Sequence, residues 1–152
     1  MKCILITGAN SYIGTSVEKY LAQWPDRYHV DTVDMMDGSW REKSFVGYDS
    51  VFHVAGIAHI KTSRLNEEDR EKYWAVNAFL PVEVAKKAKA DGVKQFIFLS
   101  SMSVYGEHGR MKKPVVITLK TPPNPNDMYG KSKLAAEQNL KELQNTTFSV
   151  AI

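Results

Sequence analysis

A tyrosine and a lysine four residues apart are the side chains best suited to proton transfer in this sequence. Both lie in the run Tyr129-Gly130-Lys131-Ser132-Lys133, and a spacing of four places Tyr129 and Lys133 on one face of a helix. A tyrosine titrates near pH ~10, and a neighbouring ammonium group favours its phenolate form, which makes the phenol a usable base nearer neutral pH. Such pairs also occur by chance on solvated helix faces. The pair therefore indicates catalysis only if the surrounding elements place it in a site.

A glycine-containing turn near the start of the chain is the second candidate for chemistry. Residues 7–14 follow the apolar run 3–6 and precede apolar residues at helical spacing. A turn between a strand and a helix lets backbone N–H groups and the helix N-terminus face a pyrophosphate. An ordinary glycine turn is the alternative reading. The residues predicted to contact a dinucleotide here are Gly8, Asn10, Ser11, Tyr12, Ile13 and Gly14.

A carboxylate at the end of the second predicted strand supports the dinucleotide interpretation. Asp34 stands at about the 20-residue offset at which an acidic residue accepts hydrogen bonds from an adenosine ribose. A carboxylate there also repels a 2′-phosphate, so the sequence favours NAD over NADP. Asp31 and Asp37 are near enough to be alternatives, and a solvated strand-end aspartate is the non-functional reading.

The elements that must position these residues alternate between strand and helix. This alternation predicts an α/β fold with a Rossmann-type, doubly wound parallel sheet, in which ligands bind beyond the carboxyl ends of the strands. Strands are predicted at residues 3–6, 28–34, 50–55, 95–99 and 147–152, and helices at residues 13–21, 66–90 and 128–144.

Three stretches depart from regular periodicity. Pro81 lies inside the second predicted helix and predicts a kink or a break there. Residues 37–47 hold too few periodic apolar residues for a helix and a strand, so we expect a reduced connection. The proline-rich residues 107–128 are interpreted as an active-site loop, and function is expected at the end of strand 95–99.

The composition excludes several classes of protein. The 20 basic and 17 acidic residues are spread along the chain without a cluster that would indicate nucleic-acid binding. No apolar run is long enough for a signal peptide or a membrane span. Cys3 is the only cysteine, so no disulfide is possible within the chain, and a cytoplasmic location is expected. His53 is interpreted as a core histidine, and no ligand spacing predicts a metal site.

In their order and spacing, these motifs resemble the extended short-chain dehydrogenases/reductases, and among them the sugar-nucleotide 4-epimerases. The resemblance runs through essentially all 152 residues. Ser11 departs from it, because the family pattern usually has a second glycine there. The motifs that carry the resemblance are residues 7–14, Asp34, Val54-Ala55-Gly56, Asn77, residues 96–101, Val104-Tyr105-Gly106 and residues 129–133.

The resemblance assigns a role to each candidate residue. It implies that Ser101 hydrogen-bonds the reacting sugar oxygen, and that Tyr129 accepts or donates the proton. Lys133 would bind the nicotinamide ribose and lower the pKa of the tyrosine, while Asn77 supports the site from the long helix. Ser100 and Ser103 are alternatives to Ser101 by position alone. The implied cofactor-binding residues also include Val54, Ala55, Gly56, Tyr129 and Lys133.

The implied reaction is the NAD-dependent, transient oxidation of a secondary alcohol of a nucleotide-sugar, as in an epimerase. A 4-keto-sugar reductase is one alternative. A 4,6-dehydratase is less favoured, because Met102 and Ser103 occupy the positions of its aspartate–glutamate acid pair. A non-catalytic dinucleotide-binding module is the alternative from another class, and the presence of Tyr129 and Lys133 argues against it.

The resemblance also predicts the organisation of the protein. Residues 1–152 are expected to form one NAD-binding Rossmann domain, incomplete and followed by a substrate domain that this sequence does not contain. We therefore expect the chain alone to be inactive. We also expect an exposed strand edge at residues 147–152, and a homodimer formed through the long helix and the tyrosine-bearing helix.

Overall fold

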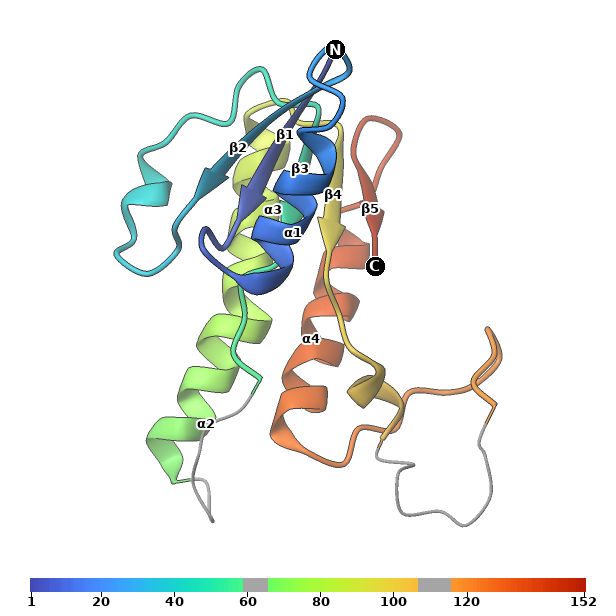
Figure 1. Ribbon diagram of the computed structural model, residues 1–152. Coiled ribbons are helices and arrows are strands. Elements are labelled where there is room, and N and C mark those ends of the chain that lie inside the picture. Colours follow the sequence, from blue (N-terminus) through green and yellow to red (C-terminus); the bar gives the residue numbers. More distant parts are fainter. Residues whose placement is uncertain (59–65, 107–115) are drawn as a thin grey trace.

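A computed structural model of the protein describes residues 1–58, 66–106 and 116–152. Its centre is one parallel sheet in the order β2-β1-β3-β4-β5 (Figure 1). The chain moves outward from β1 to β2, returns to β3 on the other side of β1, and continues outward. This reversal confirms the doubly wound α/β fold. The strands are β1 Lys2–Thr7, β2 Tyr28–Val33, β3 Ser50–His53, β4 Gln95–Phe98 and β5 Ser149–Ala151.

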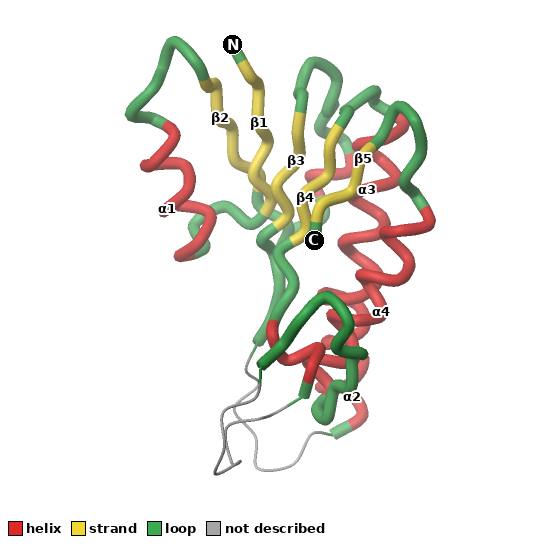
Figure 2. The backbone as a smooth tube through the Cα atoms, turned by 90° about the vertical axis from the view of Figure 1, so that its right-hand side faces the viewer, coloured by secondary structure: helices red, strands yellow, loops and turns green. Residues whose placement is uncertain are grey.

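Helices cover both faces of the sheet (Figure 2). Helix α1 (Tyr12–Leu21) lies on one face, and α3 (Leu80–Ala90) and α4 (Met128–Glu142) lie on the other. Both faces are therefore shielded, which suits the continuous apolar runs of the strands. Within the described ranges, no helix is long and apolar enough to cross a membrane.

The core lies between the sheet and helices α3 and α4. Leu5 pairs with Val51 across β1 and β3, and Val51 pairs with Phe96 across β3 and β4. All three side chains are fully buried and belong to one apolar cluster with Val84 of α3 and Leu140 of α4. Burial of each such side chain stabilises the fold by about 2 kcal/mol, so α3 and α4 are fixed firmly against the strands.

The long helix before β4 contains a π-helical segment. Helix α2 (Glu67–Tyr73) runs into the π-helix η2 (Trp74–Phe79), which leads directly into α3. Pro81 has no N–H to donate to the carbonyl of Asn77 four residues earlier, and its ring crowds that carbonyl. The break expected at Pro81 is therefore a local widening just before the proline, and the helix continues through it.

The connection between β2 and β3 is short, as expected, but it contributes to the core. Its only regular element is the 3₁₀-helix η1 (Ser39–Arg41). Trp40 and Phe45 are fully buried in the same cluster as the strands. The Phe45 N–H donates to Asp91 Oδ2 at 2.7 Å, and Arg41 forms a bidentate ion pair with Glu83. Two aromatic anchors thus replace the missing helix.

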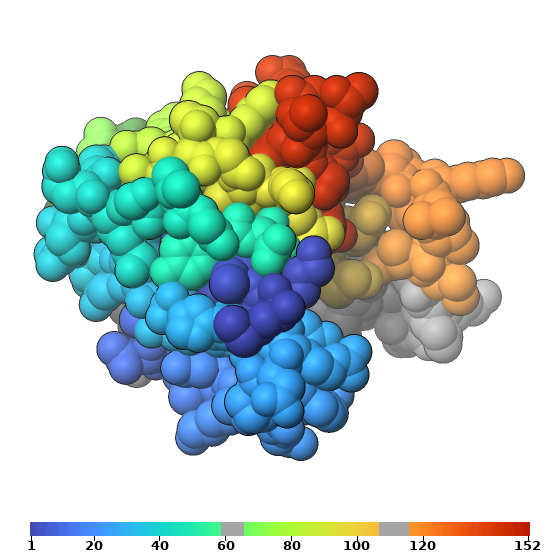
Figure 3. Space-filling view, turned by 90° about the horizontal axis from the view of Figure 1, so that it is seen from above, coloured from blue at the N-terminus to red at the C-terminus, as the bar shows by residue number. Residues whose placement is uncertain are grey.

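The proline-rich stretch after η3 (Met102–Tyr105) is described only from residue 116 onward. Residues 116–127 project from the body of the molecule (Figure 3, orange). Near Gly106 this stretch returns to η3, where the Asn124 N–H donates to the carbonyl of Val104 at 2.9 Å. The earlier half of the predicted active-site loop, residues 107–115, lies outside the described residues.

Candidate functional site

The turn after β1 is built for close approach of the backbone. Gly8 has φ +97°, and a Cβ at this position would lie 2.9 Å from the amide nitrogen of Ala55. The N–H groups of Gly8 and Ala9 both donate to the carbonyl of Val33, at 2.9 and 3.1 Å. The turn is therefore fixed between the ends of β2 and β3, and only glycine fits at its first position.

Ser11 begins helix α1 as its N-cap. Its Oγ accepts the N–H of Gly14 at 3.1 Å, and its φ of −71° suits any residue. A serine is therefore accommodated where the family pattern has a glycine, and its own O–H remains available to donate. Asn10 adopts φ +64° just before it. Tyr12 and Ile13 expose their side chains and contribute the first backbone N–H groups of the helix.

A cavity of about 490 Å³ opens beyond the carboxyl ends of the strands, where the sheet order reverses. Segments that follow β1, β2 and β3 form its walls, and the long helix closes one side. Dinucleotides bind at this place in doubly wound folds. The cavity is lined by Gly8, Ala9, Asn10, Ser11, Asp34, Met35, Met36, Val54, Ala55, Gly56, Ile57, Lys72, Val76 and Leu80.

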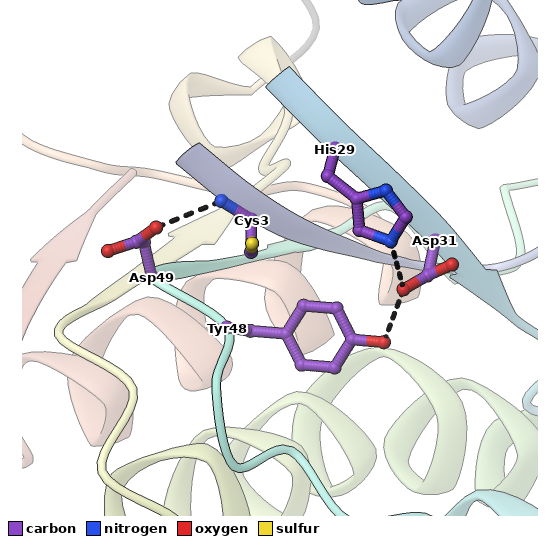
Figure 4. A network of polar contacts seen from close by, with 5 residues as sticks. All are labelled: Cys3, His29, Asp31, Tyr48 and Asp49. Atoms are coloured by element: carbon purple, nitrogen blue, oxygen red, sulfur yellow. Dashed lines mark hydrogen bonds and ion pairs between the residues drawn. The ribbon is translucent and has the colours of Figure 1, made fainter. Parts of the chain in front are cut away.

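Of the three aspartates considered from the sequence, only Asp34 lines this cavity. The Asp31 carboxylate accepts the Tyr48 hydroxyl at 2.6 Å and contacts His29 Nε2 at 3.2 Å (Figure 4). The Tyr48 hydrogen bond holds the pKa of Asp31 below its usual value. Asp37 accepts the N–H and hydroxyl of Ser39. Asp34 thus remains the candidate for ribose recognition.

Lys133 is the buried charge of the second half of the site. Its side chain is 4% exposed, and its Nζ donates to the carbonyl of Leu99 at 3.0 Å. The ammonium also lies 4.6 Å from the centre of the Phe98 ring, a cation–π distance. A Cβ at Gly56, on the cavity wall, would lie 3.2 Å from Nζ. Burial lowers the pKa of Lys133 to about 8, and nearby Glu137 opposes that shift.

Asn77 holds the chain that leaves β3. Its Oδ1 accepts the N–H of Ile57 at 2.9 Å, and its Nδ2 donates to the Ile57 carbonyl at 2.8 Å. The Nδ2 group also lies 3.4 Å from Ser132 Oγ on α4. The side chain is fully buried. Asn77 therefore fixes the backbone of Ile57, which lines the cavity next to Gly56.

The segment with Ser101 packs against the start of α4. Ser101 caps η3, and its Oγ accepts the N–H of Ser103 at 3.2 Å. Gly130 has no room for a Cβ, because its backbone lies directly against the carbonyl of Ser103. The structure thus brings the elements of Ser101 and Tyr129 together. Among the described residues, neither of their hydroxyl groups hydrogen-bonds to Lys133.

His53 lies beneath this arrangement in the core. Its Nδ1 is 2.7 Å from Thr7 Oγ1, and its ring stacks between the rings of Phe96 and Phe98. Burial, followed by the charge of Lys133, lowers the pKa of His53 to about 3, which keeps the ring neutral. The prediction of a core histidine is correct, although its Nε2 has no hydrogen-bond partner among the described residues.

No group of three or more His, Cys, Asp or Glu side chains is placed to hold a metal ion within residues 1–58, 66–106 and 116–152. The buried polar groups described above instead pair with backbone carbonyls, amides and hydroxyls.

A sequence model of the NAD dependent epimerase/dehydratase family matches residues 4–152. The chain belongs to this family. Among its relatives is a UDP-glucose 4-epimerase of Vibrio cholerae, 34% identical over 160 residues, an alignment that covers 93% of this chain and 47% of the relative. A GDP-6-deoxy-D-mannose reductase of Pseudomonas aeruginosa is 28% identical over 144 residues, with coverages of 88% and 44%.

The solved structures that match this chain have the same fold. A short-chain dehydrogenase/reductase superfamily protein from Agrobacterium tumefaciens with bound NAD superposes with a TM-score of 0.79 at 24% identity, over 97% of this chain and 47% of that protein. The NAD dependence of the family agrees with the cofactor predicted from Asp34. The chain spans less than half the length of these three relatives.

Two residues at this family member's site escaped the sequence reasoning. Glu137 is buried and accepts a hydrogen bond from the Ser100 hydroxyl. Lys72 also lines the cavity, and its ammonium pairs with Glu68 at 2.7 Å. Glu137 follows Lys133 at the same spacing of four that links Lys133 to Tyr129, so that periodicity was the available signal for it.

Proposed function

We propose that this chain binds NAD and acts in the reversible oxidation of a secondary alcohol of a nucleotide-sugar, as an epimerase. The observation that carries the proposal is the position of Lys133. Its ammonium contacts the carbonyl of Leu99, two residues before Ser101, and lies against Gly56 on the cavity wall. One buried cation therefore connects the cavity at the switch point with the helix face of Tyr129.

The residues around the cavity fit an NAD molecule. The backbone of Gly8 packs directly against Ala55 at the cavity wall, where a Cβ would not fit, and the backbone N–H groups that open α1 suit a pyrophosphate. Asp34 would accept hydrogen bonds from the adenosine ribose. Lys133 and Gly56 would adjoin the nicotinamide end. When bound, NAD supplies the acceptor and later the donor of a hydride.

The residues of the chain supply positioning and proton transfer. Tyr129 would take the proton of the sugar hydroxyl, and the positive charge of Lys133 would favour its phenolate form. Ser101 would donate a hydrogen bond to the reacting oxygen, because its Oγ already accepts from Ser103 and retains its own proton. Asn77 would hold the cavity wall in place.

A keto-sugar reductase is the second candidate. The reductase of Pseudomonas aeruginosa, 28% identical, supports it, whereas the relative from Vibrio cholerae favours an epimerase. An epimerase returns its cofactor to the starting oxidation state, and a reductase consumes reduced cofactor in proportion to product. Measurement of cofactor absorbance during turnover therefore separates the two candidates.

The substrate proposed is a nucleoside-diphosphate sugar, and we propose that residues 1–152 are the NAD-binding domain. Because the chain spans 47% of its Vibrio cholerae relative, we propose that a separate substrate domain binds most of the nucleotide-sugar.

We further propose a homodimer through α3 and α4, where Phe79 is 63% exposed just before α3. A strictly monomeric protein in sedimentation would refute the dimer.

Calorimetric titration of the chain with NAD and NADP tests the cofactor, and NAD is expected to bind more tightly.

Replacement of Tyr129 by Phe in the full-length protein tests the chemistry. Loss of a general acid–base group is expected to reduce interconversion of UDP-glucose and UDP-galactose about 10²- to 10⁴-fold, with NAD affinity unchanged. Undiminished turnover by Tyr129→Phe would refute the assignment.

A further inference from the structure

Glu137 is a buried carboxylate one helical turn beyond Lys133 on α4. Its side chain is 8% exposed. Buried carboxylates are costly unless they are paired or hydrogen-bonded, and the Ser100 hydroxyl donates to Glu137 Oε1 at 2.5 Å. Ser100 immediately precedes Ser101, whose hydroxyl is proposed to hydrogen-bond the reacting sugar oxygen. The carboxylate therefore acts on the segment that carries Ser101.

The end of β4 is attached to α4 at three successive points. Lys133 Nζ donates to the carbonyl of Leu99, and Glu137 accepts from Ser100. The carbonyl of Ser103 then lies directly against Gly130. These contacts lie on both sides of Ser101, so its position relative to the Tyr129 end of α4 is set by its neighbours.

We propose that Glu137 is a positioning residue that, through the hydroxyl of Ser100, holds Ser101 where its own hydroxyl can hydrogen-bond the sugar oxygen that exchanges a proton with Tyr129. The inference rests on the proposed function, because it takes Ser101 and Tyr129 as the reacting groups. A carboxylate is suited to this task, since hydrogen bonds to charged groups are shorter and stronger than those between neutral groups. The positive charge of nearby Lys133 also interacts favourably with the buried carboxylate of Glu137.

Two variants separate the hydrogen bond from mere packing. Glu137→Met keeps the side-chain volume but removes the acceptor, whereas Glu137→Gln keeps an oxygen that can accept from Ser100. In the full-length protein, Glu137→Met is expected to lower kcat about 10- to 100-fold, because small misplacements of reacting groups are costly, with KM changed less than about threefold. Glu137→Gln should restore most of the kcat.

The partner residue gives an independent route to the same result. Ser100→Ala removes the donor and should lower kcat as Glu137→Met does. The double variant should be no worse than either single variant, because both remove one shared contact. The matched control is Glu142→Gln, at an exposed position of the same helix, which should leave kcat unchanged. Additive losses in the double variant would overturn the proposal.

A measurement without turnover distinguishes failure of this inference from failure of the proposed function. Hydrogen exchange of the peptide 99–105 in the 152-residue chain reports the attachment of the segment directly. Exchange there should accelerate about tenfold or more in Glu137→Met and Ser100→Ala, and not in Glu137→Gln or Glu142→Gln. Unchanged exchange in Ser100→Ala would overturn the inference, whatever Tyr129→Phe does to activity.

Discussion

The two halves of the site differ in what holds them. The cavity after β1 is formed by backbone: Gly8 lies against Ala55, and α1 begins at the Ser11 cap. The face of α4 depends instead on buried polar side chains, above all Lys133, and the Asn77 side chain of η2 links the two halves through Ile57 and Ser132. In the cavity half, the close packing of backbone leaves no room for larger side chains. In the α4 half, stability depends on how well the buried charges and polar groups are paired. Added volume should therefore damage the cavity, and loss of a charge or hydrogen bond should damage the α4 face.

The largest effect is expected from a methyl group in the turn. Gly8→Ala must adopt φ +97° and place its Cβ 2.9 Å from the Ala55 nitrogen. We expect a loss of about 4 kcal/mol in unfolding free energy, from backbone strain plus overpacking, and no detectable NAD binding by calorimetry. Gly47→Ala has φ +93° with nothing within 4 Å, and should cost only the strain, about 1–2 kcal/mol. Equal losses would refute the role of space.

The next largest effect is a pH dependence of stability that arises from the buried Lys133 in the α4 half. Folding lowers the pKa of Lys133 from 10.5 to about 8, so the unfolded chain holds more protons between these values. Below pH 8 the penalty for burying the charge is fully present, and it disappears as the pH rises toward 10.5. The unfolding free energy of the native chain minus that of Lys133→Met should therefore rise by about 3 kcal/mol from pH 7 to 10.5.

Denaturant titrations across this pH range measure that difference. Lys131→Met, at an exposed position of the same helix, controls for loss of a positive charge. The difference in unfolding free energy between the native chain and Lys133→Met could instead stay constant with pH. Burial of the ammonium would then not affect stability, and the proposed difference between the two halves of the site would be wrong.

Replacement of Asn77 by Leu should have a smaller effect on stability. The change leaves the N–H and carbonyl of Ile57 without their side-chain partners. Unpaired buried groups cost about 1–3 kcal/mol, so we expect a loss near 2 kcal/mol in chemical denaturation, with weaker NAD binding. Asn139→Leu, where the amide bonds only to its own helix at an exposed position, should lie within about 0.5 kcal/mol of the native chain.

The smallest effect is expected at Asp34, the charged side chain in the cavity that is proposed to bind the adenosine ribose. Asp34→Asn should weaken NAD binding about fivefold, near 1 kcal/mol, and narrow the preference for NAD over NADP, because repulsion of a 2′-phosphate is lost. Asp37→Asn should alter neither affinity, because Asp34 lines the cavity and Asp37 does not. Calorimetry with both dinucleotides provides the test, and an unchanged preference in Asp34→Asn would contradict ribose recognition.

The sequence predicted what depends on local pattern. Apolar runs located all five strands, and the spacing of Tyr129 and Lys133 placed both on α4. The offset from the turn favoured Asp34 but left Asp31 as an alternative, and only the structure shows that Tyr48, 17 residues away, bonds to Asp31. No local pattern shows such a long-range hydrogen bond.

Long-range packing also hid other features. Trp40 and Phe45 show no regular spacing, yet both fill the core from a short connection. Phe98 was assigned to a strand, but its ring faces the ammonium of Lys133 only because α4 packs against that face of the sheet. Such contacts depend on the placement of whole elements, and propensity within a window of sequence does not contain that information.

The wide turn at Trp74–Phe79 divides the long helix into two angular phases. A π-helical turn accommodates one more residue than an α-helical turn, and each residue turns a helix by about 100°. Without that extra residue, the part of the helix that carries Lys72 would be turned by about 100° relative to α3. The widened turn thus sets the direction of Lys72, which lines the cavity, independently of Val84 and Ala85 of α3, which pack in the core.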